Sequence, residues 1–409
     1  MFPLVALPTR FRSLPIARQV ALITLFAQMV FYLPALTPYL LARGLNLTQI
    51  AGLQSILIWT MLVLEVPTGV LADRLGHHWG QRLALVCLVA GEAGFLFARD
   101  YPAFMLVQVV TGAGFAFASG SVDALVYESL PQPPTDRTEA MQRAKGQIGV
   151  AYNLGSLFAF FVGGVLVADL SLDRITLAMA LSVAAISITC AGSFLVHAPR
   201  ERTSTAVGRG GLGLVRAGVA LLRQSPQLRR VVLASLLTSA FGAHLLVLYG
   251  AYFLESDVPG GWFGPALGIG ATLAMVGQRF SYRIVGVLGA RRGVLLATGV
   301  PGVLYLLMAL TQHPVAAVSL FSVQWGMIQV SGPLFAGYLN EHIPSESGGR
   351  ATALSLINLL ASIYGGLGGI AIGALADASL SLAFAAIGAV VLVGSVTLRI
   401  DERSTVAAS

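Results

Sequence analysis

Charged side chains are scarce in this chain of 409 residues: they make up 11% of it, whereas 56% of its residues are apolar. A soluble domain carries roughly 25% charged residues, so this chain has too few polar side chains to cover a surface that faces water. Apolar stretches of about 20 residues recur along its length, and each is long enough to cross roughly 30 Å of hydrocarbon as a helix. The composition excludes a water-soluble protein and predicts an all-α integral membrane protein.

The chain is also poor in cysteine, with two residues, and in acidic residues, with 18 against 25 Lys and Arg. Cys87 and Cys190 both fall within apolar stretches, where a disulfide is not expected. The basic residues lie in short loops between apolar stretches, which is typical of membrane orientation rather than of nucleic-acid binding. The sequence has no Walker loop and no metal-ligand spacing among its histidines, so no cofactor or metal is expected, and no catalytic constellation indicates an enzyme.

The apolar stretches predict twelve membrane-spanning helices in two groups of six. The first six are expected at residues 18–43, 48–72, 81–98, 102–130, 138–168 and 174–196. The second six are expected at residues 229–254, 261–287, 292–311, 314–341, 347–376 and 378–399. We therefore expect an N-terminal six-helix bundle over 1–196, a cytoplasmic linker over 197–228 and a C-terminal six-helix bundle over 229–409.

The positions of arginine and lysine set the expected orientation. With both termini in the cytoplasm, all Lys and Arg except Arg43, Arg99 and Arg174 fall on or near the inner side. This predicts a multi-pass protein of a bacterial cytoplasmic (inner) membrane. In the linker, the apolar and basic residues from Leu212 to Arg223 fit a short amphipathic helix on the inner membrane surface, and a plain solvated linker fits them equally well.

The two halves of the chain repeat one another. An offset of 213 residues relates Gly76 to Gly289, Gly80 to Gly293, Glu128 to Glu341 and Arg137 to Arg350. Because two separate loops share one offset, we interpret the halves as a duplicated six-helix unit. Such a duplication predicts two pseudo-symmetric bundles around a central cavity, with a substrate site near the middle of the membrane.

One loop carries a recognisable motif. Between the second and third predicted helices the chain reads Gly69-Val70-Leu71-Ala72-Asp73-Arg74-Leu75-Gly76-His77-His78. This segment resembles the signature loop of the major facilitator superfamily, and the helix count and the duplication extend the resemblance over the whole chain. The resemblance implies a secondary transporter in which this loop controls conformational exchange.

The physical properties of the loop residues suggest a role for each of them, independently of the resemblance. Gly69 permits close helix approach and Gly76 a tight turn, whereas Asp73 can accept hydrogen bonds from a helix N-terminus or an arginine. A role in loop solvation and topology alone is the alternative for Asp73. The expected conformational gate comprises Gly69, Asp73, Arg74, Gly76, Glu128, Arg137, Glu341 and Arg350.

The chain departs from the drug–proton antiporters of this superfamily at two places. Gln108 precedes Gly112 where those antiporters usually carry an arginine, and Ala159-Phe160 stands where Gly-Pro is usual. Both departures argue against arginine-gated proton antiport.

Three acidic residues, Glu65, Glu92 and Asp123, lie inside predicted spans, where each costs a few kcal/mol unless it is paired or faces water. They are the candidates for coupling to a proton or another ion. The resemblance favours Asp123, because the fourth helix lines the cavity in the superfamily. An ion pair of Asp123 with Arg143 or Lys145 is the alternative.

Candidate substrate contacts are polar and aromatic residues inside the spans. They are Phe31, Tyr32, Gln108, His244, Gln324, Trp325 and Gln329. Such residues also serve in packing, but a cavity with few fixed charges suits an amphiphilic or drug-like substrate.

The function expected from the sequence is secondary active transport of such a molecule by alternating access, with proton-coupled export. Proton-coupled import of a specific metabolite is the nearest alternative, and a membrane sensor or enzyme fits less well. The expected partners are a small-molecule substrate, a proton or other coupling ion and the lipid bilayer. We expect a monomer and no nucleic acid.

Overall fold

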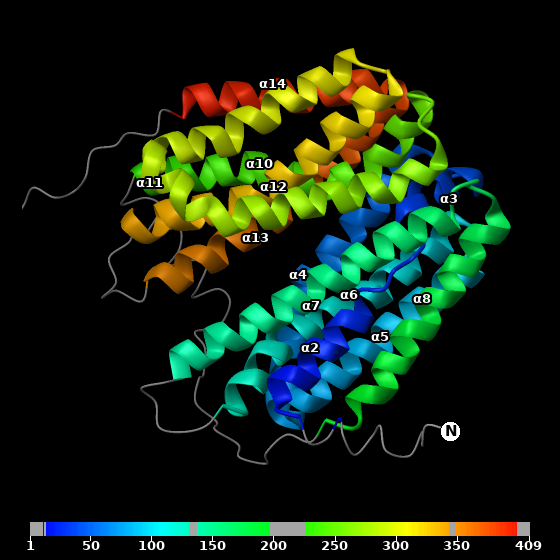
Figure 1. Cartoon of the computed structure of the whole chain (residues 1–409), viewed down its shortest axis with the longest axis vertical. Helices are drawn as coiled ribbons and strands as arrows, with labels where there is room; N and C mark the ends of the chain where they lie inside the picture. The colour runs from blue at the N-terminus through cyan, green and yellow to red at the C-terminus, as the bar shows by residue number, and fades with distance from the viewer. Residues whose placement is uncertain (1–10, 12–13, 131–136, 197–225, 343–348, 399–409) are drawn as a thin grey trace, which may run out of the picture. The chain divides into compact units, whose positions relative to one another are not determined.

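The computed structural model describes residue 11 and residues 14–130, 137–196, 226–342 and 349–398. Every regular element in these ranges is a helix, which confirms the predicted all-α membrane fold (Figure 1). Within the same ranges, ten helices are long and apolar enough to cross a membrane. The predicted amphipathic helix of the linker lies outside the described residues.

The helices fall into two halves, separated by the segment 194–225 between α8 and α10. The first half contains α2 (Ile16–Ala27), η1 (Leu33–Ala35), α3 (Leu36–Ala42), α4 (Leu47–Leu75), α5 (His77–Phe97), α6 (Tyr101–Glu128), α7 (Arg137–Leu166) and α8 (Leu172–Ser193). The second half contains α10 (Pro226–Glu255), η3 (Gly260–Trp262), α11 (Phe263–Leu310), α12 (Pro314–His342), α13 (Gly349–Ala378) and α14 (Leu380–Thr397).

The first predicted helix, 18–43, is not continuous. Helix α2 ends at Ala27, and regular structure resumes only at Leu33 with η1. Pro34 explains part of the break, because its ring would clash with the carbonyl of residue 30 in an α-helix and it restricts Leu33 before it. The first span is therefore a broken helix.

The duplication is visible in the backbone. Gly76 precedes α5 with φ 97°, and Gly289 interrupts α11 with φ 79°, a region that favours glycine. The two glycines are repeat partners, and α5 and α11 end at Phe97 and Leu310, which the same offset of 213 residues relates. Two predicted spans, 261–287 and 292–311, therefore correspond to the two parts of α11 on either side of Gly289.

The chain divides into two compact units. The N-terminal unit comprises residues 1–39 and 56–206, and the C-terminal unit comprises 40–55 and 207–409. Helix α4 is thus shared, because its first residues pack with the C-terminal unit and the rest with the N-terminal unit.

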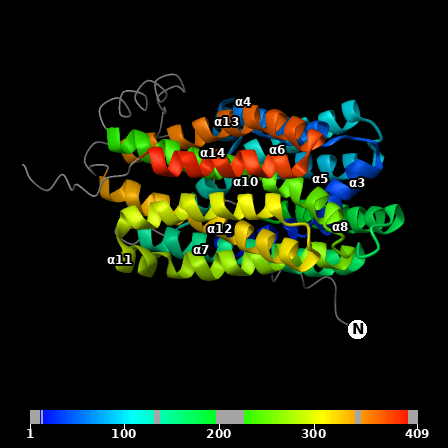
Figure 2. The same cartoon turned by 90° about the horizontal axis from the view of Figure 1, so that it is seen from above.

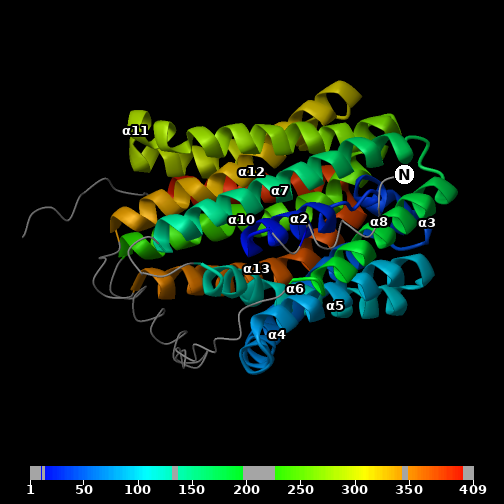
Figure 3. The same ribbon diagram turned by 60° about the horizontal axis from the view of Figure 1, so that its bottom comes forward.

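In the N-terminal unit, α5 packs against α6 and α8, and α2 packs against α7 (Figure 3). Its core includes Val20, Leu85, Leu125 and Ile186, all of which are buried.

In the C-terminal unit, α11 packs against α12 and α14, and α14 also contacts α10 and α13 (Figure 2). Its core is rich in aromatic rings: Tyr249 stacks on Phe321, and Phe253 meets Phe263 and Phe321 edge-on. Aromatic rings pack in the N-terminal unit as well, where Phe95 contacts the rings of Tyr32 and Phe104.

Candidate functional site

The break between α2 and α3 is held in place by two neighbouring helices of the N-terminal unit. The Phe31 backbone N–H donates to Ser182 Oγ of α8 at 2.9 Å. On α7, a Cβ at Gly163 would overlap the carbonyl oxygen of Phe31, so only glycine allows the broken segment to approach this closely. The Phe31 ring meets Phe158 of α7 edge-on. These contacts make the break a packed feature of the fold.

Directly beside this break lies a buried carboxyl group. The Tyr32 hydroxyl hydrogen-bonds to the Glu92 side chain of α5, and Tyr32 is only 3% exposed. The second carboxyl oxygen of Glu92, Oε2, is buried and has no hydrogen-bond partner within the described residues. Glu92 lies five residues before the end of α5, roughly 8 Å inside that end of the helix. Such a combination of a discontinuous helix and an incompletely paired carboxyl group is typical of ion sites in transporters.

Asp123 of α6 forms the ion pair that was the alternative for this residue. Lys145 Nζ of α7 lies 2.7 Å from Asp123 Oδ2, and both side chains are about half exposed, at 55% and 54%. Arg143 pairs instead with Glu139, one turn earlier on α7. Glu65 is exposed on α4, and within the described ranges its carboxylate has no hydrogen bond or ion pair, although its backbone carbonyl accepts a hydrogen bond from Thr68 Oγ1. Only Glu92 among the three acidic candidates is thus enclosed by packing.

The signature loop brings three side chains of the N-terminal unit together. His77 Nε2 lies 3.2 Å from Glu128 Oε1 and 3.8 Å from Asp73 Oδ1. The Asp73 side chain is 67% exposed, and Arg74 is also exposed. Gly76 makes the expected tight turn, and a Cβ at Gly69 would meet no atom within 4 Å among the described residues.

The remaining gate candidates cannot be placed. The side chains of Arg137, Glu341 and Arg350 lie outside the described part of the chain. The predicted gate therefore stays a prediction. His77, which is not part of the predicted gate, is the residue that links Asp73 to Glu128.

Most of the candidate cavity residues are enclosed within their own unit. Those that are buried are Phe31, Tyr32, Gln108, His244 and Gln324. His244 Nε2 lies 2.8 Å from the carbonyl oxygen of Gly365 on α13, and Gln324 faces the hydroxyl of Tyr305.

Two further candidates on α12 are less enclosed. Trp325 is half-buried, and Gln329 is exposed, with its backbone carbonyl accepting a hydrogen bond from Gln278 Nε2 at 3.0 Å. The assignment of all seven residues to a substrate cavity remains a prediction.

The sequence did not point to Asp377, whose carboxylate caps the start of α4. It accepts hydrogen bonds from the backbone N–H groups of Leu47 at 2.7 Å and Thr48 at 2.9 Å, and from Thr48 Oγ1. All three residues belong to the C-terminal unit. One turn earlier on α13, Gly373 lies against the backbone of Thr48, where a Cβ would not fit. The four-residue spacing from Gly373 to Asp377 places both residues on one face of α13. This spacing does not indicate that the face packs against α4.

Comparison with known proteins gives one consistent result. A sequence profile described as Major Facilitator Superfamily matches residues 20–355. No curated protein matches the chain. A mutant of the nucleoside transporter NupG is similar in structure, with a TM-score of 0.76 at 15% identity, over 94% of this chain and 97% of that one.

Two other solved structures are also similar. A bacterial homologue of the human lysosomal transporter Spinster, in an inward-facing and unoccupied conformation, gives a TM-score of 0.65 at 15% identity, covering 95% of each chain. A POT family transporter in complex with 5-aminolevulinic acid gives 0.70 at 13% identity, over 93% of this chain and 95% of that one. At these identities the likeness concerns the fold.

Proposed function

Because the chain belongs to the Major Facilitator Superfamily, we propose that it exports a small amphiphilic or drug-like molecule across the cytoplasmic membrane, coupled to protons. Transport proceeds by alternating access between the two repeated halves, with both termini in the cytoplasm. The positions of Lys and Arg along the sequence support this orientation.

The observation that carries the coupling proposal is the buried pair of Glu92 and Tyr32. A carboxylate among apolar helices is costly unless it is paired, and its Oε2 atom lacks a partner within the described residues. A proton on that oxygen removes the charge, and its loss restores it. Tyr32 lies in the broken segment between α2 and α3. Gain or loss of the proton on Glu92 therefore acts directly on this break in the first span.

The substrate class is argued from the composition of the candidate cavity. Its members are aromatic rings, amides and one imidazole, and none carries a fixed charge. Such surroundings suit a hydrophobic or amphiphilic molecule better than a sugar or a dianion.

A second function, proton-coupled import of a specific metabolite, is favoured by two positions. Gln108 replaces the arginine and Ala159-Phe160 replaces the Gly-Pro pair of the drug–proton antiporters. Among the similar structures, one is described as a nucleoside transporter and another as bound to 5-aminolevulinic acid, so the fold serves polar substrates as well.

Purified protein in liposomes distinguishes the two functions. A panel of lipophilic dyes and drugs is followed with and without an imposed pH gradient. We expect gradient-dependent movement of several unrelated compounds. Movement of none would contradict the proposed export and favour the importer, which is then sought by ligand-induced thermal stabilisation with nucleosides and short peptides.

The coupling role of Glu92 is tested separately with the Glu92→Gln variant. We expect gradient-driven transport to fall at least about tenfold, while exchange of labelled for unlabelled substrate, which needs no net proton movement, continues. Glu65→Gln, which changes an exposed carboxylate on α4, is the matched control and is expected to keep driven transport. Full driven transport by Glu92→Gln would remove Glu92 from the coupling mechanism.

A further inference from the structure

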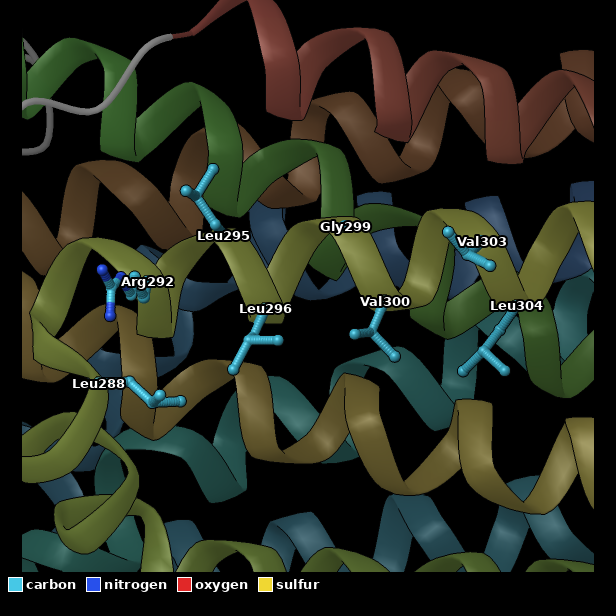
Figure 4. Close-up of a pocket in the computed structure, with 8 residues that line it drawn as sticks. All are labelled: Leu288, Arg292, Leu295, Leu296, Gly299, Val300, Val303 and Leu304. Atoms are coloured by element: carbon cyan, nitrogen blue, oxygen red, sulfur yellow. The ribbon is translucent and has the colours of Figure 1, made fainter.

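A long apolar groove runs along one side of the second part of α11. It has a volume of about 560 Å³ and is lined by Leu288, Arg292, Leu295, Leu296, Gly299, Val300, Val303 and Leu304. Figure 4 shows Arg292 beside Leu288 at one end of the groove, and Val303 and Leu304 at the other. Spacings of three and four residues keep the set from Arg292 to Leu304 on one helical face, whereas Leu288 precedes the break at Gly289.

The groove exists because the middle of that face lacks a side chain. Gly299 lies between Leu296 and Val303, and a Cβ at Gly299 would meet no atom within 4 Å. The flanking side chains Leu295, Leu296 and Val303 are exposed, at 36%, 36% and 47%. In a membrane-spanning helix, an exposed apolar face of this kind is in contact with lipid.

The charge at one end makes the groove asymmetric. Arg292 and its neighbour Arg291 are exposed, and no carboxylate pairs with either of them in the described part of the chain. From Arg292 to Leu304 the helix rises roughly 18 Å, slightly more than half of the hydrocarbon thickness. An apolar trough about one leaflet long, with a cation at its end, complements an acyl chain attached to an anionic headgroup.

We propose that this α11 groove binds one anionic phospholipid, with an acyl chain along Leu296, Gly299 and Val303 and the phosphate at Arg292. In the proposed membrane orientation Arg292 faces the cytoplasmic leaflet, where anionic lipids are found. The site is separate from the Glu92 region and does not depend on the substrate.

The test uses the whole chain of 409 residues in detergent and measures its thermal unfolding with added lipid. Phosphatidylglycerol and phosphatidylcholine with the same acyl chains are titrated in parallel, and inorganic phosphate is a third arm. We expect phosphatidylglycerol to raise the melting temperature at about fivefold lower concentration than phosphatidylcholine, the gain that one arginine near a phosphate provides. We expect inorganic phosphate to have no effect.

Two variants locate the site. Arg292→Gln should bring the half-maximal concentration of phosphatidylglycerol to that of phosphatidylcholine, and Arg99→Gln, in the loop before α6, should not. Because a Cβ at Gly299 would meet open space, Gly299→Phe should fill the groove and abolish the response to both lipids. Gly192→Phe on α8, where a Cβ also meets open space, is the control and should respond like the unmodified protein.

Three results would overturn the proposal. They are an equal response of the unmodified protein to the two lipids, a full preference for phosphatidylglycerol in Arg292→Gln, and stabilisation by inorganic phosphate alone. The Arg292→Gln result is decisive even if Gly299→Phe does not fold, because an exposed arginine is not needed for packing.

Discussion

The two halves of this chain repeat the same backbone turn, at Gly76 and at Gly289, but differ in where they carry acidic groups. The first half has Glu65, Glu92 and Asp123 inside its spans, and at an offset of 213 residues the second half has Gln278, Tyr305 and Ala336. The chain has no Asp or Glu between Asp257 and Glu341. Acidic residues therefore lie well inside the spans of the first half, whereas in the second half Glu255, Glu341 and Asp377 lie at or next to the ends of their helices.

The clearest contrast is between Glu92 and its repeat partner Tyr305. Glu92 pairs with Tyr32 beside a broken helix, whereas Tyr305 donates to the backbone carbonyl of Phe241 at 3.4 Å and stacks on Phe384. Phe241 lies in α10, which continues without a break from Pro226 to Glu255. In the first half, a carboxyl group thus lies beside a discontinuous helix. In the second half, an aromatic ring lies beside a continuous helix. This difference supports the proposal that ion coupling resides in the first half.

The largest effect is expected from making the second half resemble the first. Tyr305→Glu would bury a carboxyl group among aromatic rings, without the partner that Tyr32 provides to Glu92. We expect a loss of roughly 3–5 kcal/mol in the free energy of unfolding, measured by thermal unfolding in detergent. Tyr305→Phe removes only one hydrogen bond and should cost about 1 kcal/mol. Equal stability of Tyr305→Glu and the unmodified protein would mean that the second half tolerates a carboxyl group and that the contrast has no structural basis.

A smaller effect is expected from the glycine that admits the broken helix. Gly163→Ala places a Cβ against the carbonyl of Phe31, so the segment must shift, and we expect a loss of about 1–3 kcal/mol. Gly146→Ala, on the same helix but facing open space, should instead stabilise the protein by up to about 1 kcal/mol, because alanine favours helix. Thermal unfolding of both variants measures the difference in sign. A gain in both would show that the break does not need Gly163.

Comparison of the predicted and observed helices shows which features of the fold can be predicted from the sequence. The order of the long spans and most of their ends, to within a few residues, were predicted correctly, because the length of an apolar stretch is a local signal. Helix α5 begins slightly earlier than expected, and α13 begins slightly later. The turn at Gly76 was predicted for the same reason, since only the local backbone decides it. The break before Leu33 was missed because the helix already ends at Ala27, several residues before Pro34.

Contacts between distant residues could not be derived in the same way. The sequence identified Glu92 and Tyr32 separately, one as an ion-coupling candidate and the other as a cavity residue. Their hydrogen bond depends on how α5 packs beside the broken segment. The cap that Asp377 provides to α4 joins residues more than 300 positions apart. Both depend on tertiary packing, which periodicity and composition do not specify.

The smallest effect is expected at Asp123, and it decides which acidic residue of the first half couples to the proton. The ion pair with Lys145 is half exposed, so solvent screens it, and Asp123→Asn should change stability by no more than about 1 kcal/mol. If coupling depends on Glu92, gradient-driven transport by Asp123→Asn should remain within about fivefold of the unmodified protein, because a change of about 1 kcal/mol in an activation barrier alters a rate by about fivefold. Lys145→Gln is the matched control and should behave in the same way. If Asp123→Asn lost driven transport and Glu92→Gln kept it, proton coupling would be assigned to Asp123 instead of Glu92. The contrast between the halves would then depend on a charge facing water rather than on one enclosed by packing.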